Sequence, residues 1–123
     1  MKIFLLLGSV SALLAVVFDA FAAHALKKTL AADMLVIFQT GARYQFYHAL
    51  GLLAVGLSAK NLGDSPYWHW AGWSMCAGIV LFSGSLYVLA LTGVRGVGAI
   101  TPLGGLAFIA GWAMFTVAVW KAL

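Results

Sequence analysis

Four apolar stretches, each roughly 20 residues long, dominate the hydrophobic pattern of the chain. They run from Ile3 to Ala25, from Thr40 to Ala59, from Trp68 to Leu91 and from Ile100 to Trp120. An α-helix needs about 20 apolar residues to cross a hydrocarbon core about 30 Å thick. The pattern therefore predicts an all-α integral membrane protein, with one membrane domain over 1–123 built as an up-down-up-down bundle of four transmembrane helices.

Polar and helix-breaking residues between these stretches place the helix ends. We expect helices over about 3–26, 33–59, 67–92 and 100–121. The connection Lys60–Pro66 is polar and leads into tyrosine and tryptophan residues typical of an interfacial aromatic belt. Thr92–Gly98 is short and rich in glycine. Thr101 and Pro102 then have the pattern of a helix N-cap followed by proline in the first turn. Small residues four apart, such as Gly8 with Ala12 and Ala107 with Gly111, predict close helix packing.

Composition supports this class and excludes others. Hydrophobic residues make up 64% of the 123 residues and charged residues only 8%, which is typical of a chain that crosses a membrane several times. The single cysteine, Cys76, excludes an intrachain disulfide and a cysteine metal cluster. The net charge of +4 is spread over single or paired cations, so nucleic acid is not an expected partner.

The N-terminal stretch also resembles a signal peptide, because Lys2 and an apolar run precede the small-residue pattern Ala20–Ala22, which is typical of a cleavage site. We expect this helix to be retained, since the run exceeds the usual signal core of about 7–15 residues and Asp19 precedes the pattern. Lysine and arginine are nearly balanced between the two ends of the predicted bundle, so their distribution gives no orientation.

Two charged residues interrupt the first two stretches at similar depth. We call the membrane face expected to hold Lys27 and Arg95 side B, and the opposite face side A. At 1.5 Å per residue, Asp19 lies about 9 Å and Arg43 about 10 Å from the midplane toward side B. An isolated charge facing lipid at that depth is costly, and an opposed pair offsets much of the cost. The spacing therefore predicts an Asp19–Arg43 ion pair.

More polar side chains surround this pair on the second helix. They are Gln39, Tyr44, Gln45, Tyr47 and His48. Two interpretations stay open: these groups satisfy one another and fix the helix register, or they line a small cavity for a headgroup, an ion or a proton. His48, the deepest of them, and Asp19 are the plausible proton carriers.

The remaining chemistry-bearing residues are dispersed. His24 is expected roughly 13 Å from His48 along the membrane normal, and His69 at the opposite interface, so no metal centre or other cofactor is predicted. Ser83 and Ser85 have no sequence-evident base partner, so no catalytic residue is assigned. Arg95 lies beside the N-terminus of the fourth helix, where it either binds a lipid phosphate or simply extends to the membrane surface.

Several motifs resemble those of the YgdD/YwdK-like family of small membrane proteins. They are Asp19–Leu26, Arg43–Leu50, Leu81–Gly93, Gly98–Gly105 and Gly111–Trp112. This family is also known as domain of unknown function 423 and is related to animal transmembrane protein 256. The resemblance covers nearly the whole chain and implies a four-helix protein of the bacterial inner (plasma) membrane. It leaves the activity open.

Carried over position by position, the resemblance points to nine residues: His24, Tyr44, Gln45, His48, Ser83, Ser85, Tyr87, Thr101 and Pro102. At Asp19 and Ala22 this chain departs from the family pattern, which typically has glycine. The expected Asp19–Arg43 pair is therefore a feature of this chain rather than of the family.

The sequence favours a non-enzymatic membrane protein that acts through contacts with membrane lipids or with a protein, either a membrane-protein partner or a second copy. Its candidate site lies in the side-B half and comprises Asp19, His24, Arg43, Tyr44, Gln45, Tyr47, His48, Ser83, Ser85, Arg95 and Thr101. Two other functions stay open. One is a minimal transporter or proton pathway through His48 and Asp19, and the other is a membrane-embedded enzyme that uses Ser83 or His48.

Overall fold

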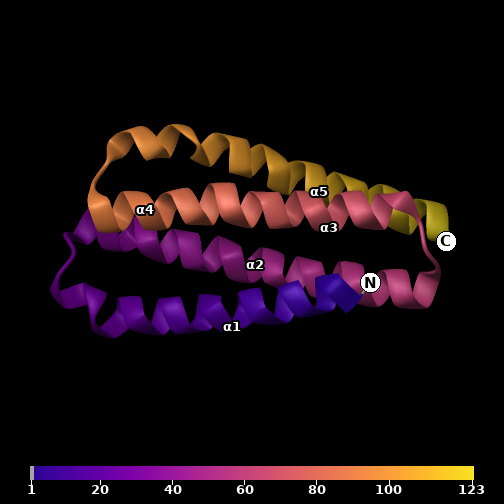
Figure 1. Ribbon diagram of the computed structural model, residues 1–123, viewed down its shortest axis with the longest axis horizontal. Helices are drawn as coiled ribbons and strands as arrows, with labels where there is room; N and C mark the ends of the chain where they lie inside the picture. The colour runs from indigo at the N-terminus through magenta and orange to yellow at the C-terminus, as the bar shows by residue number, and fades with distance from the viewer. Residues whose placement is uncertain (1) are drawn as a thin grey trace.

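Long helices lying side by side make up the computed structural model, which describes residues 2–123 (Figure 1). The helices are α1 (Lys2–His24), α2 (Ala32–Leu62), α3 (Pro66–Gly78), η2 (Ile79–Ser83), α4 (Gly84–Thr92) and α5 (Thr101–Ala122), with short 3₁₀ turns η1 (Leu26–Lys28) and η3 (Arg95–Ala99). The π-helical turn η2 joins α3 and α4 into one continuous rod. No strand occurs in the described residues, as the all-α prediction requires.

Neighbouring rods are joined at alternate ends of the molecule, and α1 begins at the same end at which α5 finishes (Figure 1). Helix α1 packs on α2, α2 packs on α3 and α4, and α5 packs on α3 and η2. Helix α2 therefore lies inside the row, between α1 and the α3–η2–α4 rod.

Three segments within residues 2–123 are long and apolar enough to cross a membrane. They are Lys2–Lys28, Pro66–Thr92 and Arg95–Ala122. Helix α2 is not among them, and it carries the charged residues Asp33, Arg43 and Lys60. These three segments make the chain a membrane protein. Length and composition alone do not assign a membrane crossing to α2.

Local sequence explains most of the helix ends. The Ser65 hydroxyl accepts a hydrogen bond from the Tyr67 backbone N–H, and Pro66 follows in the first turn of α3. Gly93 ends α4 with φ of 73°, a left-handed conformation that glycine adopts at little cost. The predicted N-cap role of Thr101 is wrong. Ile100 already has helical φ and ψ, so Thr101 lies inside the helix and turns its hydroxyl toward α4.

Glycines set the close approach of the helices. A methyl group at Gly8 of α1 would lie 2.9 Å from the Ala49 carbonyl oxygen of α2. The Phe108 ring covers Gly78, and the backbone of Phe82 covers Gly104. Small residues let helix backbones approach in this way inside membranes.

The core at the side-A end is apolar. It consists of Phe4, Leu52, Val55, Ala59, Trp68, Ala71, Met75 and Ala118. Trp68 is fully buried and donates its indole N–H to the Gly63 carbonyl, so it does not belong to the predicted interfacial belt. Trp70 and Trp73 are about half exposed and can serve there. A second, smaller apolar cluster fills the side-B end, around Ala22, Leu26, Phe38 and Ala90.

Candidate functional site

Gln45 connects three helices through its side-chain amide. Its side chain is 4% exposed. The amide N–H donates to the Ser11 carbonyl of α1 at 2.9 Å, and the amide oxygen accepts from the Tyr87 hydroxyl of α4 at 2.7 Å. Both ends of the amide therefore have partners, and the bridge holds α2 in register with its two neighbours.

Three further hydroxyl groups, near η2 and α4, make separate hydrogen bonds. Ser83 is fully buried and donates to the Gly41 carbonyl of α2 at 2.7 Å. Ser85 donates to the Phe82 carbonyl at 2.9 Å and lies 2.6 Å from the Thr101 hydroxyl. Because a hydroxyl has a single proton to donate, Thr101 donates to Ser85. We call Gln45, Ser83, Ser85, Tyr87 and Thr101 the interior network.

Every side chain in the interior network has a hydrogen-bond partner. More generally, no fully buried side-chain nitrogen or oxygen in residues 2–123 lacks one. An unsatisfied polar group in hydrocarbon is costly, so the network removes a penalty and fixes helix register at the same time. Of the two interpretations of the polar residues on the second helix, satisfaction by hydrogen bonds within the protein is the one that fits Gln45.

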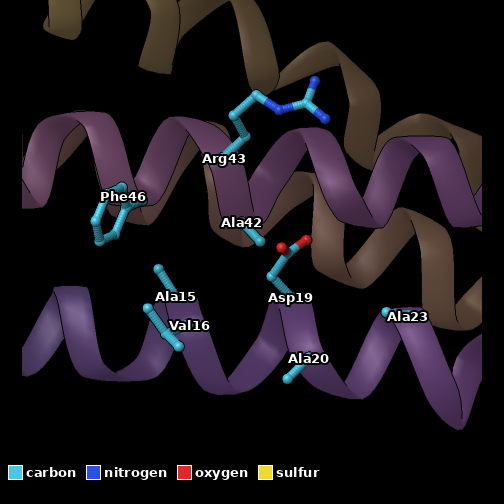
Figure 2. A pocket seen from close by; sticks show the side chains of 8 residues that line it. All are labelled: Ala15, Val16, Asp19, Ala20, Ala23, Ala42, Arg43 and Phe46. Carbon is cyan, nitrogen blue, oxygen red and sulfur yellow. The ribbon is translucent and has the colours of Figure 1, made fainter.

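The predicted Asp19–Arg43 ion pair is wrong. The acid–base side-chain contact found in the described part of the chain is a hydrogen bond between His69 and Asp64, at 3.2 Å, which is an ion pair only when the histidine is protonated. Asp19 points from α1 toward α2 beside Ala42, whereas Arg43 extends from a different side of α2 (Figure 2). Ala42, which is 1% exposed, occupies the position facing α1. The next residue is rotated by about 100°, so Arg43 turns away.

Asp19 and Arg43 nevertheless line the same groove. It has a volume of about 410 Å³ and runs between α1 and α2 (Figure 2). The other lining residues are Ala15, Val16, Ala20, Ala23, Ala42 and Phe46. We call it the Asp19/Arg43 groove. The two charged residues therefore share a groove on the exposed flank of the helices without forming a pair.

One ring nitrogen of His48 has a hydrogen-bond partner among residues 2–123, and the other has none there. Its ring is 5% exposed and stacks on Phe108, with centroids 3.5 Å apart and planes 8° apart. The ring Nδ1 lies 2.7 Å from the Tyr44 carbonyl oxygen. A carbonyl only accepts, so Nδ1 carries the proton, and Nε2 of the neutral ring has a free lone pair.

This histidine lines a second groove, between α2, η2 and α5, with a volume of about 710 Å³. Its walls are Tyr44, Phe82, Pro102, Gly105, Leu106, Phe108, Ile109 and Trp112. We call it the His48 groove. Sequence reasoning missed its aromatic side, although Phe108 and Trp112 are one helical turn apart on α5 and so share a face.

Three other predicted site residues line neither groove: Tyr47, His24 and Arg95. Tyr47 is 48% exposed and lies beside the Tyr44 ring. His24 is exposed near Lys27 and Lys28, and Arg95 is exposed in η3. The predicted set therefore separates into the interior network, the two grooves and an exposed remainder. Within residues 2–123, no three histidine, cysteine or acidic side chains cluster as metal ligands would.

Internal hydrogen bonds join the apolar helices, and three helical segments of the described chain are long and apolar enough to cross a membrane. These features define the class as a membrane protein with several spans. Residues 18–105 match the family model described as protein of unknown function (DUF423), and the chain belongs to this family. This confirms the family identified from the sequence motifs.

Relatives in the family match over full length. The chain is 50% identical to the UPF0382 membrane protein YwdK of Bacillus subtilis (strain 168), over the whole of both chains. It is 46% identical over 121 residues to a UPF0382 membrane protein of Staphylococcus saprophyticus, covering 98% of this chain and 99% of that one. No solved structure matches this chain.

Proposed function

We propose that this chain is a non-enzymatic, four-span protein of the bacterial inner membrane that binds a zwitterionic phospholipid in the Asp19/Arg43 groove. Its relatives are bacterial and are named as membrane proteins. Helix α2 packs between α1 and the α3–η2–α4 rod, both of which are apolar enough to cross a membrane. A helix enclosed by membrane-crossing neighbours crosses with them, which gives the up-down-up-down arrangement.

The observation that carries the lipid site is the pair of opposite charges that share one groove without contacting each other. A zwitterionic headgroup has the complementary charges: its phosphate pairs with the Arg43 guanidinium, and its ammonium donates to the Asp19 carboxylate. An anionic headgroup without an ammonium leaves Asp19 unpaired. Asp19 lies about 9 Å from the middle of α1, and local bilayer thinning around polar groups brings a headgroup to that level.

This site predicts a preference for phosphatidylethanolamine over phosphatidylglycerol. Protein in nanodiscs with equal amounts of both lipids is released into a native mass spectrometer, and the retained lipids are counted. We expect phosphatidylethanolamine to be retained several-fold more often. Asp19→Asn should reduce that preference about fivefold, which corresponds to about 1 kcal/mol. Arg43→Gln should weaken retention of both lipids, because both carry a phosphate.

Two matched variants control for charge alone. Asp33→Asn and Lys121→Gln make the same charge changes at exposed positions that do not line the groove. They should leave lipid retention unchanged. Equal retention of the two lipids by the unmodified protein would contradict the proposal. A protein subunit that co-purifies and is lost in the Arg43 variant would assign the groove to a protein partner instead.

The two other candidate functions have less support. Asp19 and His48 line different grooves, and the core at the side-A end consists of apolar residues, so a proton path through both residues lacks connecting groups. The Ser83 hydroxyl donates to the Gly41 carbonyl, which is a structural partner rather than a base.

A further inference from the structure

The His48 groove contains one polar group in otherwise apolar surroundings. The Nε2 atom of His48 makes no hydrogen bond to any residue of the described chain, and it is not among fully enclosed atoms lacking a partner. His48 lines the groove and Nε2 is not fully enclosed, so we expect this nitrogen to face it. The ring itself is held rigidly by the Tyr44 carbonyl and the Phe108 stack. The groove therefore offers a fixed acceptor for a single hydrogen bond.

The walls of the groove favour a flat ring. Tyr44, Phe82, Phe108 and Trp112 supply aromatic faces and edges, which bind other rings in stacked or edge-on arrangements. Gly105 leaves space on the α5 side, because a methyl group there would have no neighbour within 4 Å. The volume of about 710 Å³ falls within the range of small-molecule sites.

The level of His48 restricts the occupant further. Helix α2 runs from Ala32 to Leu62, so His48 lies about 1.5 Å, one residue, from its middle. If α2 crosses the bilayer as proposed above, the groove opens near the midplane, where water is scarce and charged headgroups do not reach. A fitting ligand is therefore soluble in the hydrocarbon core and carries a hydrogen-bond donor on a ring.

We propose that the His48 groove binds the ring of a membrane-soluble quinol, whose hydroxyl group donates to His48 Nε2 while the ring packs against Phe108 and Trp112. Lipid-soluble quinols combine a flat ring, a ring hydroxyl and an apolar tail. The corresponding quinone has acceptors only, and two acceptors cannot form a hydrogen bond. The site therefore prefers the reduced form. It depends on α2 crossing the membrane but not on the lipid site at Asp19 and Arg43.

Three probes separate the hydrogen bond from ring binding: decylubiquinol kept under anaerobic reducing conditions, decylubiquinone, and the dimethyl ether of the quinol. Each is titrated into ¹⁵N-histidine-labelled protein in phosphatidylcholine nanodiscs, and the ¹⁵N signal of His48 Nε2 is followed. We expect the quinol to move this signal toward that of a protonated nitrogen. It should also bind about tenfold more tightly than the other two probes.

Substitutions in the groove test its location. Gly105→Leu should fill the groove and abolish binding of all three probes, whereas Gly84→Leu is a matched control. Gly84 is also a helical glycine with no neighbour within 4 Å of an added methyl group, but it lies outside the groove. His48→Phe should keep the stack on Phe108 and bind all three probes equally. If His48→Phe does not fold, the comparison of Gly105→Leu with Gly84→Leu still tests whether the probes bind in the groove.

Three outcomes would overturn the proposal. The first is equal affinity for the quinol and its dimethyl ether in the unmodified protein. The second is binding that persists in Gly105→Leu. The third is a dimer that Gly105→Leu dissociates while no probe binds, which would make the groove a contact between two copies. Because the Asp19 and Arg43 variants leave the groove intact, lipid selectivity and quinol binding can fail separately.

Discussion

Replacing Gly104 with alanine is expected to lower the free energy of unfolding by about 3 kcal/mol, at the upper end of what an added methyl group costs in a packed core. The new methyl group would overlap the backbone of Phe82, and its distance to the Phe82 Cα would be only 2.7 Å. A backbone atom cannot rotate away as a side chain can. Helix α5 and η2 therefore have to separate, and the Ser85–Thr101 hydrogen bond beside them is strained as well.

The next residue provides the control. A methyl group at Gly105 would meet nothing within 4 Å, so Gly105→Ala should be neutral or slightly stabilising, since alanine favours helix more than glycine does. Both variants are compared with the unmodified protein by reversible unfolding in mixed detergent micelles. Equal stability of the two variants would show that α5 and η2 are not in close contact.

Replacing Gln45 with leucine is expected to cost about 2 kcal/mol, because the Tyr87 hydroxyl then stays buried without its acceptor. The Ser11 carbonyl suffers less, since it lies inside α1 and keeps its helical partner. Tyr87→Phe alone should cost less than Gln45→Leu, because it leaves the second hydrogen bond of the amide intact.

A double-mutant cycle isolates the bridge. If Gln45 and Tyr87 are hydrogen-bonded, the double variant Gln45→Leu/Tyr87→Phe should be about 1 kcal/mol more stable than the sum of the single effects predicts. Strictly additive losses in the same unfolding assay would mean that the two side chains do not interact.

The length and spacing of apolar residues were enough to predict helices in the right places. They were not enough to predict which polar groups meet. Asp19 and Arg43, which the sequence places at similar depth, do line one groove. Contact also depends on the angular position of each residue on its helix. Ala42 takes the position facing α1, and a single residue step of about 100° puts Arg43 elsewhere.

The interior network shows a second limit. Gln45 belongs to the polar face of α2 that the sequence identifies, but its partner Tyr87 follows the π-helical turn Ile79–Ser83, and Ser83 is the last residue of that turn. Such a turn accommodates about one extra residue and rotates everything after it relative to a regular α-helix. The sequence carries no clear signal for this turn, so the directions of Ser83, Ser85 and Tyr87 could not be inferred from helical periodicity.

Both grooves and the interior network include residues of α2, so the crossing of the bilayer by α2 is the property to measure. Single cysteines at Lys28, Asp64 and Gly96, in a Cys76→Ala background, are labelled in intact cells with a membrane-impermeant maleimide and again after lysis. A crossing α2 places Asp64 on the membrane face opposite to Lys28 and Gly96, which share a face. Labelling of Lys28 and Asp64 from the same side would contradict the four-span arrangement and, with it, the position of His48 near the midplane.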